Sequence, residues 1–457
     1  MSAWNIHITV GEFFLDFAWM GLLLVIATFA RRHIPLLQRF LVPNNLIAGI
    51  LGLLLGMNGL AILDLQSARL GAYVYHLLAL LFIALSLRSP QQKLGLTSIK
   101  FGLIFLMVYL VQGLVGLGLA FILIYTFMPD LFAGIGLLLP LAFGMNPGIA
   151  YTIGQNWEGY GFESGAIVGL SFAAIGFLVA YTLGIGLMRK GIRDGKAAYI
   201  EGGTEVSEEI RTGFLEPGNR RNGGHLTTSA EAIESLTLHI ALIGFTYILT
   251  WALMKLMETG LTFVGAAQEI STLWSFHFIF AAVTALGFRL VLDRLAVSFI
   301  IDDVTMTRTS NLFMDFMIVA SVAAISFAVV AAYGLPILVL GISAAAATWL
   351  VVHLATKSAF SEFVLERFAA IFGNMTGTLQ SALILLRVLD PDMKSPVSHN
   401  LVYGSGLALA LGFPLLIIIN APIHHFDDIL AGFWMVFGAL LAYLVLILLV
   451  WRFISKR

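Results

Sequence analysis

Long apolar runs separated by short polar segments make up most of the chain. Each run has about the 20 residues that an α-helix needs to cross the hydrocarbon core of a bilayer. No run shows the two-residue alternation that is typical of a lipid-facing β-strand. The pattern therefore predicts an all-α polytopic membrane protein. We predict eleven spanning helices, at 13–30, 43–63, 71–87, 101–127, 164–188, 236–257, 273–291, 312–332, 335–354, 400–420 and 429–451.

Two further apolar runs, 131–157 and 359–390, are interrupted by small and helix-breaking residues. The first contains Phe143-Gly-Met-Asn-Pro-Gly148, and the second contains Phe372-Gly-Asn-Met-Thr-Gly377. Irregular backbone at membrane depth is tolerated only where protein buries it or where it lines a wet cavity. We therefore expect both runs to be re-entrant, so that each leaves the membrane on the side from which it entered.

The distribution of Lys and Arg predicts the topology. Basic residues gather at the ends of the first, third, fifth and seventh predicted spans, for example at Arg31, Arg88, Arg189 and Arg289. The positive-inside rule places these ends, and the loops that follow them, in the cytoplasm. The N-terminus is then outside and the C-terminus is cytoplasmic. All of these loops lie on the cytoplasmic side only if 131–157 enters and leaves the membrane from outside and 359–390 enters and leaves it from the cytoplasm.

This topology predicts two inverted repeats. Residues 13–188 and 234–420 would each supply five helices and one re-entrant segment, and 429–451 would be an additional C-terminal transmembrane helix. The polar segment 189–233 would be a flexible cytoplasmic linker between the repeats. Inverted repeats are the build of many secondary transporters, which bind their solutes near the bilayer midplane.

Composition and motifs exclude other classes of protein. The chain is 59% hydrophobic and only 11% charged, whereas a soluble domain has roughly 45–50% apolar and about 25% charged residues. Its net charge of −1 gives no electrostatic footprint for nucleic acid. It has no Cys, and it lacks the common nucleotide-binding, metalloprotease and serine-hydrolase motifs. We therefore expect a protein that is not an enzyme, that has no organic cofactor, and whose partners are a small solute and membrane lipid.

The interrupted runs carry the candidate site. Broken helices direct free N–H groups at anions and free carbonyl groups at cations, and an Arg among apolar residues suits a carboxylate. The residues expected to bind the solute are Asn146, Gly148, Tyr151, Thr152, Thr376, Gly377, Thr378, Gln380, Ser381 and Arg387. Asn146, Asn374 and Asp315 are the candidates for Na⁺. Two alternatives stay open: the glycines permit close helix packing only, and Arg387 extends to the membrane interface.

The chain resembles the bacterial sodium/glutamate symporter family, as a divergent member. Residues 39–49, with Pro43-Asn-Asn45, are similar to that family's entry into its second span. Residues 151–162 are similar to the segment after its first re-entrant loop, and 370–390 take the place of its second. The resemblance implies two inverted five-helix domains in a homodimer with elevator-like movement. It also implies Na⁺-coupled uptake of an acidic amino acid.

The sequence thus predicts Na⁺-coupled symport of a small anionic solute, such as glutamate or another carboxylate, across the bacterial inner membrane by alternating access. The alternative is a channel, because two opposed re-entrant loops also build selectivity filters. Accumulation that depends on a Na⁺ gradient favours the symporter. Downhill flux without coupling favours the channel.

The topology is tested by reporter fusions at the two ends of the chain. Eleven spans put the ends on opposite sides, so a reporter that is active only outside should work at the N-terminus and fail at the C-terminus. A reporter that is active only in the cytoplasm should give the reverse pattern. The same pattern at both ends would contradict the count of eleven.

Overall fold

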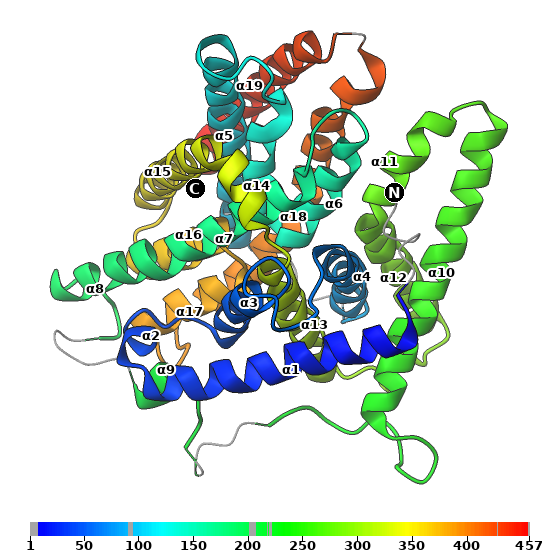
Figure 1. Cartoon of the computed structure of the whole chain (residues 1–457). Coiled ribbons are helices and arrows are strands. Elements are labelled where there is room, and N and C mark those ends of the chain that lie inside the picture. Colours follow the sequence, from blue (N-terminus) through cyan, green and yellow to red (C-terminus); the bar gives the residue numbers. More distant parts are fainter. Residues whose placement is uncertain are drawn as a thin grey trace. The chain divides into compact units, whose positions relative to one another are not determined.

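The computed structural model describes residues 8–89, 95–200, 207–216, 218, 222–426 and 428–455. These ranges form helices and no strands (Figure 1). Eight of the described helices are long and apolar enough to cross a membrane, and the count is nine if one pair bent by 69° forms a single span. The chain is therefore a multi-pass membrane protein, as predicted.

The eight helices agree with eight of the predicted spans. They are α1 (Val10–His33), α4 (Ser67–Ser86), α5 (Leu96–Thr126), the run of α7 (Gly165–Val179), η4 (Ala180–Gly184) and α8 (Ile185–Arg193), α10 (Ser235–Phe263), α15 (Gly334–Ala359), α18 (Val397–His425) and α19 (Ile429–Ile454). The bent pair, η5 with α11 (Ala267–Ser275) and α12 (His277–Arg294), covers the span predicted at 273–291.

Two predicted spans differ in the structure. The helix within 43–63 is α3 (Asn44–Leu55), which has only 12 residues, because the chain turns back after Gly56 and Ile62 donates to Leu55 O at 2.9 Å. The run at 312–332 is divided between α13 (Asp303–Ala323) and α14 (Phe327–Ala332). The first half of α13 carries Thr, Ser, Asn and Arg side chains, and only its second half is strongly apolar.

The remaining elements are short. They are α2 (Pro35–Arg39), η2 (Ala133–Leu137), η3 (Pro140–Met145), α6 (Pro147–Glu158), α9 (Glu208–Thr212), η6 (Ser298–Ile300), α16 (Val364–Thr376) and α17 (Leu379–Leu389). Four of them, η3, α6, α16 and α17, lie in the two interrupted runs. The re-entrant paths of these runs, and the inverted relation of 13–188 to 234–420, stay predictions.

The chain divides into two compact units, and each unit takes segments from both predicted repeats. Unit 1 consists of Met1–Val25, Ile47–Gln92 and Leu215–Ala324, and unit 2 consists of Ile26–Leu46, Lys93–Phe214 and Ile325–Arg457. The additional helix predicted at 429–451 is α19, in unit 2.

In unit 1, α4 packs against α12 and α13 through buried apolar residues such as Ala79, Ile83 and Ala285. A buried ion pair fixes the start of α4. Arg69 Nε lies 2.9 Å from Asp16 Oδ2 and Arg69 Nη2 lies 3.0 Å from Asp16 Oδ1, which is the bidentate geometry that a guanidinium and a carboxylate prefer. Both side chains are buried.

In unit 2, α5 is the central helix and contacts α15, α18, α19 and η2. Glycines allow these backbones to approach closely. A Cβ added to Gly116 of α5 would lie 2.1 Å from the carbonyl oxygen of Gly136 in η2. Any larger residue at Gly116 would therefore separate α5 from η2.

The linker predicted at 189–233 contacts each unit at the points that the structure describes. On unit 2, Ala198 N donates to Glu366 Oε1 at 2.7 Å, and Arg31 Nη2 donates to Ile210 O at 2.7 Å. On unit 1, Arg308 Nη1 donates to the carbonyl of Gly223 at 2.6 Å. The linker is therefore held at these positions as well as solvated.

The Arg69–Asp16 pair should be among the strongest single contributions to the stability of unit 1. Replacing Arg69 with Ala leaves a buried, unpaired carboxylate, which costs about 3–5 kcal/mol. We expect a large fall in the unfolding midpoint of the purified protein. The matched control is Lys196→Ala, which breaks the exposed pair with Asp194 and should cost less than about 1 kcal/mol. Equal shifts for the two variants would contradict the anchoring role of Arg69.

Candidate functional site

The first interrupted run contains a helix break, here called break A, between η3 and α6. The π-helical turn η3 ends at Met145, Asn146 is extended with φ −167° and ψ 141°, and α6 begins at Pro147. Proline suits the first position of a helix because its missing N–H is not needed there. Asn146 caps α6, since its Oδ1 accepts from Gly148 N at 2.8 Å. Its own N–H donates back to Leu141 O.

Break A leaves carbonyl groups without helical partners. The N–H groups of Ile149 and Ala150 both donate to Asn146 O, at 3.0 and 3.2 Å, and Pro147 has no N–H. The carbonyl groups of residues 142–145 therefore receive no N–H from the described turn that follows them. Such oxygens at a helix end carry partial negative charge and can bind a cation.

The second interrupted run contains break B, between α16 and α17. Helix α16 ends at Thr376, Gly377 has φ −156° and ψ −111°, and α17 begins after the extended Thr378. The start of α17 is held by side chains. Thr378 N donates to Ser381 Oγ at 3.4 Å, and that hydroxyl lies 2.7 Å from the Tyr181 hydroxyl of η4.

The two breaks meet within unit 2, where α7 and α5 contact both. Helix α7 does so through Gly176, because a Cβ added there would lie 2.6 Å from Thr376 O and 3.4 Å from the ring of Phe143. Helix α5 does so through Gln112, whose Nε2 donates to Met375 O at 3.1 Å. A Cβ added to Gly144 would lie 3.2 Å from Gln112 Oε1.

The structure brings most of the predicted solute-binding residues together around these breaks. Buried in unit 2 are Asn146, Gly148, Tyr151, Thr152, Thr376, Gly377, Thr378, Ser381 and the candidate cation ligand Asn374. Gln380, which is half-buried, accepts at its Oε1 from Asn45 Nδ2 at 3.1 Å.

Several predicted residues contact their own helix in this structure. The hydroxyl of Thr376 donates to Phe372 O at 2.8 Å, and the hydroxyl of Thr152 donates to Ile149 O at 3.1 Å. Arg387 is half-buried in the last turn of α17. Asp315 lies on α13 in unit 1, whereas the breaks lie in unit 2.

Sequence reasoning missed Gln112 and Tyr181. It weighed ionisable residues and the residues next to the breaks, and these two lie on other elements. One signal was present for Gln112, because it is an amide in the middle of a long apolar helix, where polar groups are costly and usually have a role. Tyr181 also lies in the interior of a span, Gly165–Arg193, but the sequence gives no indication that its hydroxyl would reach Ser381.

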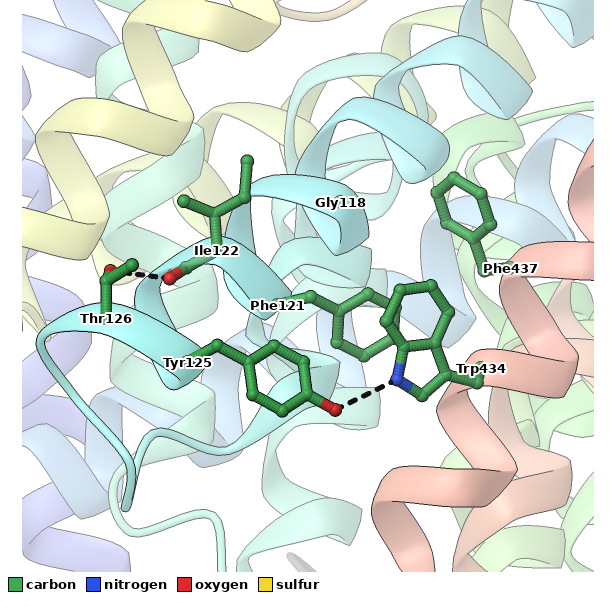
Figure 2. Close-up of a pocket in the computed structure, with 7 residues that line it drawn as sticks. All are labelled: Gly118, Phe121, Ile122, Tyr125, Thr126, Trp434 and Phe437. Carbon is green, nitrogen blue, oxygen red and sulfur yellow. Dashed lines mark hydrogen bonds between the residues drawn. The ribbon is translucent and has the colours of Figure 1, made fainter.

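A separate groove of about 280 Å³ lies between α5 and α19. Phe121 and Trp434 stack with ring centroids 4.0 Å apart, and Trp434 Nε1 donates to the Tyr125 hydroxyl at 3.2 Å, as Figure 2 shows. Its lining residues carry no charge. The groove suits an apolar group such as a lipid chain. The breaks remain the better candidate for an anionic solute.

No protein-family model, no curated protein and no solved structure matches this chain. The resemblance to the sodium/glutamate symporters therefore stays an expectation. The geometry of the two breaks is the feature of the molecule that points to a function. Among the described residues, no group of three or more His, Asp or Glu side chains gathers in a way that could hold a metal ion. A cation at the breaks would be held by carbonyl and amide oxygens.

The contact at Gly176 can be tested by adding one methyl group. In Gly176→Ala the new Cβ meets Thr376 O, a backbone atom that cannot rotate away, and overpacking of this kind costs about 1–3 kcal/mol. We expect a lower unfolding midpoint. Gly186→Ala is the matched control in the same run of helix, because nothing lies within 4 Å of its added Cβ. It should leave the midpoint unchanged or raise it slightly, since Ala favours helix over Gly. Similar behaviour of the two variants would contradict the close approach of α7 to break B.

Proposed function

We propose that the protein is a secondary active transporter that couples the movement of a small anionic solute to Na⁺. The observation that carries the proposal is the meeting of two broken helices on α5 and α7 within unit 2. In a membrane protein, broken helices that meet inside a bundle supply backbone groups of both signs at one place. The proposed location is the bacterial inner membrane, with the N-terminus outside, the C-terminus in the cytoplasm and a homodimeric assembly.

The starts of α6 and α17 support an anionic solute. The helix dipole puts partial positive charge at both starts, although the N–H groups of residues 148–150 in α6 already donate to Asn146. The hydroxyls of Thr378 and Ser381 and the amide of Asn146 add polar groups beside these starts. Arg387, in the last turn of α17, would have to reach back towards this start to supply a guanidinium for a carboxylate in the solute.

The ends of η3 and α16 support a cation. Their last carbonyl groups lie at the C-terminal end of each element's own dipole and carry partial negative charge. Discontinuous helices of transporters use such carbonyl groups for coupling ions. A cation bound near the solute would also reduce the cost of bringing its negative charge into a site of low dielectric.

The division of the chain supports alternating access. A carrier needs one body that holds the site and a second body against which it can change position. Both breaks belong to unit 2, so unit 2 would hold the solute. A channel has no such requirement, and for this reason the carrier is our proposal.

The proposal is tested by measuring the thermal stability of the purified protein with amino acids and with di- and tricarboxylates, each in Na⁺ and in K⁺. A ligand present at 100 times its Kd stabilises the native state by about 2.7 kcal/mol. We expect one carboxylate to raise the unfolding midpoint in Na⁺ and to have little effect in K⁺. In liposomes, the same solute should accumulate against its gradient when Na⁺ is imbalanced. Uncoupled downhill flux would overturn the carrier in favour of the channel.

Arg387 provides a matched pair of variants. If it binds a carboxylate through two parallel N–H groups, Arg387→Ala should weaken solute binding about tenfold or more. Arg387→Lys keeps the charge but loses the fork, and it should recover only part of the affinity. Wild-type affinity in both variants would show that Arg387 does not bind the solute.

A further inference from the structure

The orientation of the Gln112 side-chain amide is determined by two acceptors. Gln112 Nε2 donates to Thr348 Oγ1 at 2.8 Å and to Met375 O at 3.1 Å. The Thr348 hydroxyl uses its own proton on Ala344 O at 2.7 Å, so it can only accept from Gln112. Met375 O is a carbonyl and has no proton to give. Both contacts require the NH₂ group of the amide, and the Oε1 atom must point away from them.

Gln112 Oε1 is left without a hydrogen-bond donor among the residues that the structure describes. The side chain is 0% exposed, and it lies in the middle of α5, one of the candidate membrane spans. A buried acceptor with no partner costs about 1–3 kcal/mol. A contact that satisfies Oε1 would recover this cost.

Gln112 Oε1 faces break A. The position of a Cβ on Gly144 is 3.2 Å from Oε1 and 2.5 Å from the Tyr109 ring, so the lack of a side chain at Gly144 lets the backbone of break A approach Gln112 closely. Gly144 lies among residues 142–145, whose carbonyl groups receive no N–H from the following turn. An amide oxygen and the end of a helix with unused carbonyl groups therefore lie side by side.

We propose that Gln112 Oε1 and the carbonyl groups at the end of η3 bind a desolvated monovalent cation. Neutral oxygens of this kind replace the hydration shell of monovalent ions in channels and transporters. Divalent ions in proteins are usually bound through carboxylates, and no described carboxylate contacts Gln112. The inference rests on the proposed function for the ion's role in coupling, while the binding itself is measured separately.

The same amide would link the ion to the second break. The NH₂ group of Gln112 holds Met375 O at break B, and its oxygen would hold the ion at break A. A cation bound to Oε1 would polarise the amide and strengthen the hydrogen bonds that its N–H groups donate. Occupation of the site would thus tighten the contact between α5 and α16, close to the proposed solute-binding residues Thr376 and Thr378.

The test is a titration of the purified wild-type chain, without solute, with NaCl, LiCl or KCl at constant ionic strength balanced by choline chloride. We expect one of these alkali cations to raise the unfolding midpoint in a saturable way that choline does not reproduce. In Gln112→Leu the concentration for half-maximal stabilisation should rise about tenfold or more, because a charged ligand loses one of its partners.

Two further variants separate the role of Gln112 Oε1 from the structural role of its NH₂ group. Thr348→Val removes one acceptor of Nε2 and keeps Oε1, so it should lower the midpoint in choline while leaving the cation response within about threefold of wild type. Gly144→Ala keeps Gln112, but its Cβ would meet the Tyr109 ring at 2.5 Å and push break A away from Oε1, so it should weaken the response as Gln112→Leu does. If Gln112→Leu does not fold, Gly144→Ala decides.

A wild-type cation response in Gln112→Leu or, where that variant does not fold, in Gly144→Ala would overturn the site. The absence of a specific cation response in the wild-type chain would overturn it too. Solute binding that needs no alkali cation but is lost in Gln112→Leu would also overturn it, because Oε1 would then accept from the solute. These failures are distinguishable from failure of the proposed function, which is judged by solute binding and accumulation.

Discussion

Backbone N–H and C=O groups that are buried away from water need hydrogen-bond partners, and this constraint governs the arrangement of unit 2. Breaks A and B each interrupt a helix and deprive some of these groups of their helical partners. The surrounding residues respond to that cost: Asn146 caps α6, Ser381 and Tyr181 hold the start of α17, and Gln112 donates to Met375 O. In the proposed function, these two adjacent breaks serve ligand binding.

The location of the breaks could be predicted from the sequence because their causes are local. Pro147 cannot continue the hydrogen bonds of the preceding turn, and Gly377 lies where a Cβ would be only 2.5 Å from Ser381 Oγ. The partners of the breaks could not be predicted, because Gln112 reaches Met375 across 263 residues of sequence. Apolar periodicity gives no information on such a contact. The apolar pattern also predicted a full span at 43–63, but the turn after Gly56 shortens the helix to 12 residues.

The two units and the two predicted repeats divide the chain in different ways, and the difference has a consequence for the site. Break A comes from 13–188 and break B from 234–420, yet both belong to unit 2. If the repeats arose by duplication, each copy would supply one break to the same site. Neither copy could form that site alone, because Gln112 and Gly176 of the first copy contact residues 375 and 376 of the second.

The charge balance of the breaks limits what they can carry. Unit 2 offers helix starts to an anion and helix ends to a cation, and these are fractional charges that cannot neutralise a full ionic charge. Arg387 is the one full charge among the predicted solute-binding residues. An anion held only by dipoles would keep most of its desolvation cost, whereas an anion bound together with a cation forms a nearly neutral pair. The proposed site is therefore better suited to both ions than to either alone, and this is the physical basis of the coupling that we propose.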